Sequence, residues 1–397
     1  MTNAVIVDVV RTAVGKGKPG GALSGTHPVE LLAHVLRSLV ERNGIDPAQV
    51  DDVIGGCVNQ ASEQSLNISR TALLAAGFPE SVPATTIDRQ CGSSQQAAHF
   101  AAQGIIAGAY DMVIACGVES MSRIPMGTSS MGKDTHGPSI RARYPEGLVN
   151  QGISAELIAA KWKLDRDALD AYSARSHQRA AEAIAAGFFD KEIVPIDVTN
   201  AAGEQVRHTV DETVRATTTA EGLAGLKPSF YTEDYAARFP EAQWIITPGN
   251  SSPLTDGASA ALIMSEELAN KLGLTPRARF HSFSVAGDDP VFMLTAPIPA
   301  TQKVLAKAGL SIDDIDAYEV NEAFAPVPLA WAHEFGADPA KLNPRGGAIA
   351  LGHALGSSGT RLLSTLVNHL EATGGRYGLQ TMCEGAGMAN ATIIERI

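Results

Sequence analysis

Two cysteines and a histidine stand in settings that suit nucleophilic catalysis. Cys91 lies where an extended run, TTID, meets a helical pattern that starts with small residues. A cysteine at a helix N-terminus faces unpaired N–H groups and the positive end of the dipole, which lower its pKa. Gly92, Ser93 and Ser94 leave space for a substrate beside the sulfur. Most isolated cysteines fill a core, but this setting favours Cys91 as a nucleophile.

His353 lies in the glycine-rich stretch GGAIALGHALGSSG, whose glycines allow the backbone to approach a ligand closely. The stretch fits neither GxxxxGK[ST] nor a clean GxGxxG, so it is not a standard phosphate loop. A lone histidine is more often a structural residue than a base. The position of His353 in an internal repeat, opposite the Cys91 turn, favours the catalytic interpretation.

Two further loops carry polar residues directly after expected strands. Cys383 precedes Gly385, so its thiol either stands at an exposed strand end or belongs to the core, like Cys116. Asn321 follows a buried strand in EVNEAFAPV, where an amide can hold a water or donate to an oxyanion. Two cysteines and a histidine from separate loops suit proton transfer combined with nucleophilic attack.

The elements that must position these residues alternate between apolar strand-like runs and Ala-rich helical patterns, which predicts an α/β fold. Buried strands are expected at 4–10, 51–58 and 111–118. Residues 27–44 predict a helix that ends at Gly44.

The C-terminal third repeats the N-terminal order at an offset of roughly 260 to 270 residues. The His353 stretch corresponds to TTIDRQCGSS, and GLQTMCEGAGM corresponds to DMVIACGVESM. We therefore expect two homologous halves that pack around a shared interface. The expected division is 1–120 with 251–270, an insertion at 121–250, and 271–397.

The insertion matches nothing in the second half, and an insertion of this size is usually a lid or a binding domain. Its basic residues either meet the phosphates of an anionic ligand or are solvated charges: Arg123, Lys133, Arg141, Arg143, Lys161, Lys163, Arg215 and Lys227.

Composition narrows the class further. The chain has 397 residues, 45% hydrophobic, enough for a sizeable core in two domains or one duplicated domain. A net charge of −12 argues against nucleic-acid binding. The four cysteines form no CxxC pair, so neither a metal site nor a disulfide framework is expected. No export signal or membrane span is visible, and we expect a cytoplasmic protein.

Four blocks in this sequence resemble the active-site blocks of the thiolase family in the same order, from residue 4 to the final ERI: CGSSQQA, VNEAFA, GGAIALGH and CEGAGMA. The resemblance implies a duplicated αβαβα layered fold with two five-stranded layers and an inserted loop domain over the coenzyme site. It also implies an acyltransferase that cleaves 3-ketoacyl-CoA with CoA, or runs the reverse condensation. Such enzymes use CoA as substrate without a further cofactor and form dimers or tetramers.

The resemblance also implies roles for individual residues. Cys91 takes the acyl group as a thioester, His353 deprotonates Cys91, and Cys383 moves the proton on the α-carbon. Asn321 with its water and His353 form one oxyanion hole. The backbone N–H groups of Cys91 and Gly385 form the other.

Four more positions are assigned to substrate binding by the same resemblance. Ser252 contacts the pantetheine arm, and Arg215 lies near the adenine nucleotide. Met293 and Phe324 line the acyl pocket.

The chain departs from the family pattern at several points. The usual GHP reads GHA with Ala354, and the usual NxNGG reads NPRGG with Arg345. Asn150 and Gln151 replace the His-Met pair of short-chain biosynthetic enzymes, which favours bulky or ring-derived acyl groups such as those of steroid breakdown.

Three alternative functions fit these motifs less well. CGSS shares only three letters with the CGSCW of papain-type proteases, and no export signal or disulfide pattern supports that class. Decarboxylating ketoacyl-synthase enzymes use Cys-His-His, and the second cysteine at 383 argues against them. A non-catalytic acyl-CoA-binding relative is expected to lose Cys91 or His353, and both are present.

Overall fold

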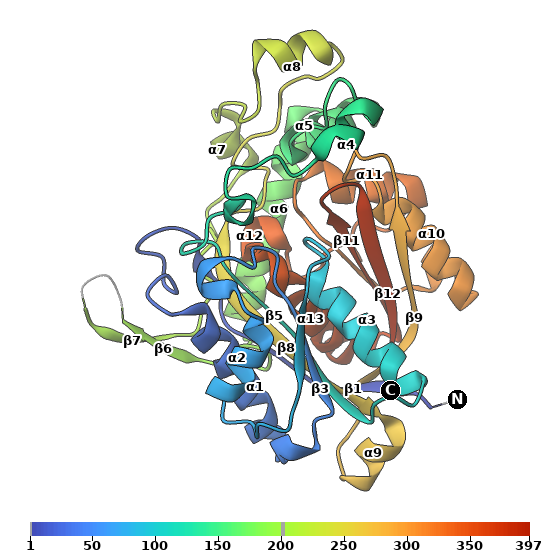
Figure 1. The fold of residues 1–397 in the computed structure, drawn as a ribbon. Coiled ribbons are helices and arrows are strands. Elements are labelled where there is room, and N and C mark those ends of the chain that lie inside the picture. Colours follow the sequence, from blue (N-terminus) through green and yellow to red (C-terminus); the bar gives the residue numbers. More distant parts are fainter. Residues whose placement is uncertain (1, 200–202) are drawn as a thin grey trace.

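A mixed ten-stranded sheet organises the protein, for which a computed structural model describes residues 2–199 and 203–397 (Figure 1). The strand order is β10-β11-β12-β9-β1-β8-β5-β3-β4, with β2 paired to β8 off this path and β6 and β7 in a separate hairpin. The strands are β1 (Ala4–Arg11), β2 (Gly15–Lys16), β3 (Asp52–Gly56), β4 (Ala84–Ile87), β5 (Met112–Ser120), β6 (Ile196–Thr199), β7 (Gln205–His208), β8 (Thr255–Ser265), β9 (Ala278–Gly287), β10 (Ala317–Val320), β11 (Tyr377–Glu384) and β12 (Met388–Arg396).

The helices lie mostly between these strands along the chain, and the three expected strands are confirmed as β1, β3 and β5. The helices are α1 (Pro28–Asn43), α2 (Ile68–Ala75), α3 (Ser93–Ile106), α4 (Gly137–Arg143), α5 (Gln151–Lys161), α6 (Arg166–Ala185), α7 (Ala220–Ala224), α8 (Glu233–Arg238), α9 (Glu266–Lys271), α10 (Pro297–Ala308), α11 (Pro326–Phe335), α12 (Ala348–Leu351) and α13 (Ser358–Thr373). The predicted helix α1 ends before Gly44, which adopts the left-handed conformation with φ 62°.

The sheet consists of two halves that meet at a short contact. Strands β4, β3, β5, β8 and β1 come from the first repeat and β9, β12, β11 and β10 from the second. Only two residue pairs join β1 to β9. In the described residues the second half lacks the fifth strand that the resemblance implies, and a single bridge between Tyr318 and Leu342 remains. The following Asn343 has φ 43°, and Pro344 lacks an N–H, so neither can continue the ladder.

Helices α3 and α13 form the middle layer between the two halves. Their alanine and leucine side chains share one apolar cluster with strands of both halves. Helices α1 and α2 cover the outer face of the first half, and α10 and α11 cover that of the second. The layers therefore follow the order α, β, α, β, α (Figure 1).

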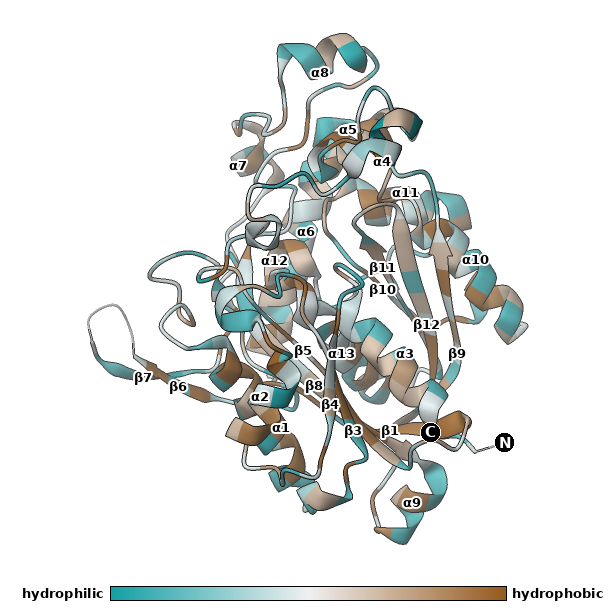
Figure 2. Ribbon diagram, viewed as in Figure 1, coloured by the Kyte–Doolittle hydropathy of each residue, from teal (hydrophilic) through white to brown (hydrophobic). Residues whose placement is uncertain are grey.

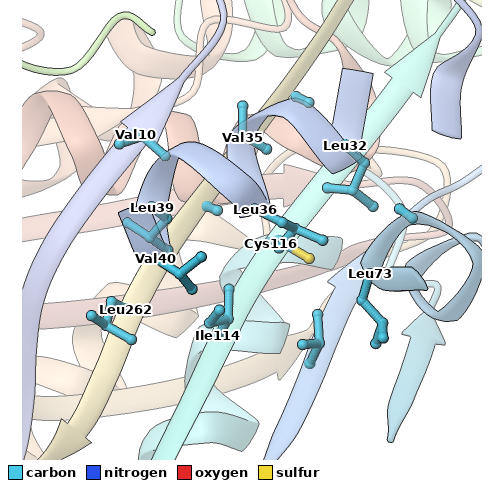
Figure 3. Close-up of a cluster of buried hydrophobic side chains, with 14 of the residues drawn as sticks. Val10, Leu32, Val35, Leu36, Leu39, Val40, Leu73, Ile114, Cys116 and Leu262 are labelled. Carbon is cyan, nitrogen blue, oxygen red and sulfur yellow. The ribbon is translucent and has the colours of Figure 1, made fainter. Parts of the chain in front are cut away.

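The outer layer of the first half is densely packed (Figure 3). Leu32, Leu36 and Leu39 of α1 face Ile114 of β5, and the sulfur of Cys116 lies among them. Figure 2 colours the ribbon by hydropathy. Strands in the interior of the sheet are largely brown, which marks hydrophobic residues, whereas helix α8 shows more teal, which marks hydrophilic ones.

The segment between β5 and β8 contains α4 to α8 and the β6–β7 hairpin. Helices α4, α5, α7 and α8 gather at one end of the molecule, and the hairpin projects to one side (Figure 1). No described helix is both long and apolar enough to span a membrane.

Candidate active site

Cys91 lies in a tight turn just before α3. Gly92 is the N-cap of that helix, and Gln90 adopts the left-handed conformation with φ 49°. The Cys91 side chain is buried against Met121, Leu355, Leu362 and Met382. The turn also contacts the second half, because Asn390 Nδ2 of β12 donates to Gly92 O at 2.9 Å. The nucleophile candidate therefore sits at the junction of the two halves.

The environment of Cys91 differs from the sequence expectation. Burial, together with the nearby Cys383 and Glu384, raises the pKa of the Cys91 thiol well above its ordinary value. The expected lowering by the helix N-terminus is outweighed because the sulfur is removed from water. Cys91 is therefore a neutral thiol at rest and needs a base to take its proton.

His353 is held in one tautomer by a short hydrogen-bond chain. Its Nδ1 lies 2.7 Å from Ser358 Oγ, and Ser358 Oγ donates to Ala354 O at 2.8 Å. Because the single hydroxyl hydrogen is used there, Nδ1 carries the ring proton and Nε2 keeps its lone pair. Burial and the nearby Arg361 lower the pKa of His353 to about 3. The ring is neutral at neutral pH and able to accept a proton at Nε2.

Asn321 connects His353 to Cys383. Its Nδ2 lies 3.4 Å from His353 Nε2. Burial raises the pKa of Cys383 to about 12, while hydrogen bonds from the Asn321 side chain and the Ala323 backbone favour its thiolate. The sequence allowed Cys383 to be either an exposed thiol at a strand end or a core cysteine. Neither interpretation fits fully, because the thiol is buried but has polar neighbours. Cys116 differs, because it is surrounded by apolar side chains (Figure 3).

Gly385 lies at the start of the β11–β12 turn, next to the Cys91 turn. A Cβ atom at Gly385 would lie 2.8 Å from Gln90 Oε1. The structure thus brings Cys91, His353, Cys383, Asn321 and Gly385 to one place between the halves.

Two glycines of the His353 stretch have a different use from the expected one. A Cβ on Gly356 would lie 2.6 Å from Gly56 O, and one on Gly359 would lie 2.1 Å from Gln95 N. These glycines allow the backbones of the two repeats to touch, so they serve packing between the halves rather than approach to a ligand.

Glu119, which our sequence analysis did not single out, holds the His353 stretch from the other half. The carboxylate lies at the end of β5 and is fully buried. It accepts the backbone N–H groups of Val58 and Asn59 at 2.9 and 3.1 Å, and that of Gly356 at 3.0 Å. Its signal in the sequence is a charged residue at the end of an otherwise apolar strand.

Glu384 is a second carboxyl that our sequence analysis passed over. It follows Cys383, is fully buried, and its oxygens have no hydrogen-bond partner in the described part of the chain. A Cβ on Gly92 would lie 2.1 Å from Glu384 Oε1, so the carboxyl touches the Cys91 turn. Burial raises the pKa of Glu384 to about 8, and the group is protonated at neutral pH.

Ser252 and Arg215 line one groove of about 480 Å³, together with His177 and Ile349. A neighbouring cavity of about 400 Å³ shares Arg215. The groove runs beside the Asn321 segment, since Ser252 N donates to Ala323 O at 3.0 Å.

The other two predicted binding residues, Met293 and Phe324, do not line this groove, although Phe324 forms a β-bridge with Ser251 at its edge. Met293 and Phe324 are buried in the apolar cluster that also contains Cys383. Among the basic residues of the insertion, Arg123 pairs with Glu63 and Arg141 with Asp134. Within the described ranges, no group of three or more His, Cys, Asp or Glu side chains is arranged to hold a metal ion.

The duplicated layered fold, with two cysteines, a histidine and an asparagine meeting between its halves, defines the class of protein. The family model "Thiolase, N-terminal domain" matches residues 4–267, and "Thiolase, C-terminal domain" matches residues 274–396. The chain therefore belongs to the thiolase family and is an acyltransferase.

Individual relatives cover the whole chain. Steroid 3-ketoacyl-CoA thiolase FadA6 of Mycobacterium tuberculosis (strain ATCC 25618 / H37Rv) is 50% identical, covering 100% of this chain and 95% of the relative. A 3-ketoacyl-CoA thiolase of Aliivibrio salmonicida (strain LFI1238) is 46% identical, with 100% of both chains covered. The crystal structure of the Bacillus anthracis acetyl-CoA acetyltransferase superimposes with a TM-score of 0.89 at 38% identity, covering 100% of this chain and 99% of the other.

Proposed function

We propose that the protein cleaves 3-ketoacyl-CoA with CoA into a shortened acyl-CoA and acetyl-CoA, or runs the reverse condensation, through an acyl-enzyme on Cys91. The observation that carries this proposal is the convergence of Cys91, His353, Cys383 and Asn321 between the halves, with the His353 Nε2 lone pair directed toward Asn321. The names of the relatives support the substrate class.

In the first half-reaction, His353 Nε2 takes the proton of Cys91, and the thiolate attacks the 3-keto carbon. The bond between C2 and C3 then breaks, leaving the acyl group on Cys91 and an acetyl-CoA enolate. Cys383 protonates the enolate carbon, and acetyl-CoA leaves.

In the second half-reaction, the Cys383 thiolate takes the proton of CoA, and the CoA thiolate attacks the acyl-enzyme. The Cys91 thiolate leaves and recovers its proton from His353. A water held by Asn321 and the protonated His353 donate to the enolate oxygen, while the N–H groups of Cys91 and Gly385 donate to the tetrahedral oxyanion. Each such donor typically lowers the barrier by about 2.7 to 4 kcal/mol.

The groove that contains Ser252 and Arg215 is proposed as the coenzyme site. Residues 121–250 form the inserted domain that covers it, between an N-terminal half (1–120 and 251–270) and a C-terminal half (271–397). The position of Arg215 in the groove and the bond from Ser252 to the Asn321 segment support this assignment. CoA serves as substrate, and no further cofactor is proposed.

We propose a bulky or ring-derived acyl group as the preferred substrate, with Met293 and Phe324 lining its pocket. The family resemblance supports this, because Asn150 and Gln151 stand where short-chain biosynthetic enzymes have a His-Met pair, and so does the name of the 50% identical relative, a steroid 3-ketoacyl-CoA thiolase. Comparing turnover of acetoacetyl-CoA with that of a bulky 3-ketoacyl-CoA tests it. A strong preference for acetoacetyl-CoA would overturn the substrate assignment.

A cytoplasmic homo-oligomer, either a dimer or a tetramer, is proposed for the assembly. The family resemblance supports it. Light scattering coupled to size-exclusion chromatography would measure the mass of the particle, and a monomer at micromolar concentration would contradict the proposal.

The central experiment follows the enolate absorbance of a 3-ketoacyl-CoA after CoA is added. Cys91→Ala is expected to lower kcat by at least about 10⁴-fold, because the covalent route is removed. Cys116→Ala is the matched control, since that thiol lies in the outer core. Undiminished turnover in Cys91→Ala would refute the acyl-enzyme.

A further inference from the structure

Glu322 is a buried carboxylate directly after Asn321, and four hydrogen bonds surround it. Its Oε1 accepts from Tyr172 Oη at 2.7 Å and from Asn343 Nδ2 at 2.9 Å. Its Oε2 accepts from Ser176 Oγ at 2.7 Å and from the backbone N–H of Ile349 at 3.1 Å. All four acceptor positions of the carboxylate are used, so the group has a single orientation.

Two of the donors come from the insertion. Tyr172 and Ser176 are four residues apart on α6, so their side chains lie on the same face of the helix. Ser176 Oγ also accepts the backbone N–H of Gly347 at 3.1 Å. A Cβ on Gly347 would lie 2.3 Å from the Glu322 carboxyl carbon, so only glycine permits this approach.

The other two donors lie within the segment that carries His353, on the N-terminal side of the histidine. Ile349 lies in α12, four residues before His353. Asn343 holds the strand before the catalytic asparagine, because its side chain accepts from Val320 N and donates to Val320 O, both at 2.9 Å. The carboxylate therefore joins the strand that ends at Asn321 to the segment that ends at His353.

The same helix also reaches the proposed coenzyme groove. His177 follows Ser176 on α6, lines the groove, and its Nδ1 accepts the backbone N–H of Arg215 at 3.2 Å. Adjacent residues of one helix thus contact the coenzyme groove and the carboxylate behind the oxyanion hole.

We infer that Glu322 is a positioning residue: through the bonds from Tyr172 and Ser176 it aligns Asn321 and His353, so that the inserted domain sets the geometry of the enolate oxyanion hole. This inference rests on the proposed function, because it assigns the carboxylate to a hole made by Asn321 and His353. The four groups that donate to Glu322 are all uncharged.

Glu322→Gln tests the inference directly. The amide nitrogen replaces an acceptor, and either Ile349 N or Asn343 Nδ2 then faces another donor. We expect kcat to fall roughly 10²-fold, as for a displacement of about 1 Å, while the KM for CoA changes less than about threefold. Exchange of the α-protons of acetyl-CoA in D₂O, which reports enolate formation, is expected to fall by the same factor.

Milder variants protect the test against misfolding. Tyr172→Phe and Ser176→Ala each remove one donor to Glu322, together with the acceptor of Asn343 Nδ2 or Gly347 N, and each is expected to lower kcat roughly threefold to tenfold. Ser173→Ala is the matched control, because its hydroxyl is equally buried but bonds to Leu169 O within the same helix. Glu156→Gln is the control for a buried carboxyl, since Glu156 accepts from the backbone N–H groups of Trp244, Ile245 and Ile246 and, within the described residues, forms no hydrogen bond with Asn321 or the His353 segment. Both controls are expected to keep kcat per folded molecule within about twofold.

The outcomes separate this inference from the proposed function. The inference is overturned if Glu322→Gln retains kcat and α-proton exchange within twofold of wild type. It is equally overturned if Glu156→Gln loses as much kcat or as much α-proton exchange as Glu322→Gln does. A Glu322→Gln variant that changes only the KM for CoA would also overturn it. Failure of the proposed function is seen separately, as thiolysis that survives in Cys91→Ala.

Discussion

The turn that carries Cys91 (residues 88–94) and the segment that carries His353 (residues 343–358) occupy corresponding positions in the two repeats, but they are held differently. The Cys91 turn is anchored by a neutral amide, from Asn390 to Gly92 O. The His353 segment is anchored by two buried carboxylates, with Glu119 on Gly356 N and Glu322 on Ile349 N.

This difference follows from what each side chain has to do. A carboxyl group accepts several N–H groups at once, as Glu119 does from Val58, Asn59 and Gly356, which suits a base that must stay in one orientation. A negative charge beside Cys91 would oppose its thiolate. The carboxyl that does touch the Cys91 turn, Glu384, is kept protonated by burial, with its pKa raised to about 8. The carboxyls that fix the base are therefore saturated with hydrogen-bond donors, whereas the carboxyl beside the nucleophile has no partner in the described residues and stays protonated.

Removing the base is expected to have the largest effect on this comparison. His353→Gln leaves Cys91, whose pKa is raised by burial, without a group to take its proton. We expect kcat to fall by about 10² to 10⁴-fold, and the rate of Cys91 alkylation by iodoacetamide to fall with it. Unchanged alkylation at neutral pH would show that the thiolate forms without His353.

Glu119→Gln is expected to have the next largest effect. An amide cannot accept from Val58 N, Asn59 N and Gly356 N together, so at least one buried N–H loses its partner. We expect the free energy of unfolding to fall by about 1 to 3 kcal/mol and kcat to fall roughly tenfold. Urea titration and steady-state kinetics measure the two quantities. A loss of stability without loss of kcat would separate Glu119 from the orientation of His353.

Asn390→Ala removes the amide that anchors the Cys91 turn, and we expect it to lower stability and kcat less than Glu119→Gln does. The free energy of unfolding should fall by about 1 kcal/mol, and kcat should stay within about threefold of wild type. The same urea titration and kinetic assay apply. If this variant loses as much kcat as Glu119→Gln, the contrast between the amide anchor and the carboxyl anchors is wrong.

Glu384→Gln is expected to have the smallest effect on turnover at neutral pH, because the amide resembles the protonated carboxyl. Its effect is on the pH dependence of stability. The folded pKa of about 8 exceeds the ordinary value of 4.5, so between these values the folded state keeps a proton that the unfolded state has lost. Stability therefore falls as pH rises through this window, by up to about 1.4 kcal/mol per unit.

Thermal unfolding of the wild type and Glu384→Gln at pH 5, 6, 7 and 8 measures this slope. The variant should show the shallower decline. The decline should persist in part, because burial also raises the pKa of Glu319 to about 8. If the melting temperatures of the two proteins decline in parallel with pH, Glu384 does not titrate between pH 5 and 8.

Much of the architecture could be predicted from local patterns. The apolar runs identified β1, β3 and β5, and Gly44 marked the end of α1. The repeat indicated a duplicated fold, which the family match and the structural neighbour confirm. The prediction of a fifth strand in the second half was wrong, because Asn343 adopts a positive φ and Pro344 has no N–H to donate to a neighbouring strand.

The chemical types and chain positions of Cys91, His353, Cys383 and Asn321 were visible in the sequence by itself, since a motif records side-chain identity and local spacing. Only the tertiary structure decided the protonation states of these side chains and the contacts that hold them. Burial, which no motif records, reversed the expected pKa shift of Cys91. The anchors depend on contacts between residues 237 and 298 positions apart, from Glu119 to Gly356 and from Asn390 to Gly92. Such contacts form when two halves pack together, and a local pattern carries no information about which buried carboxylate will meet which backbone N–H.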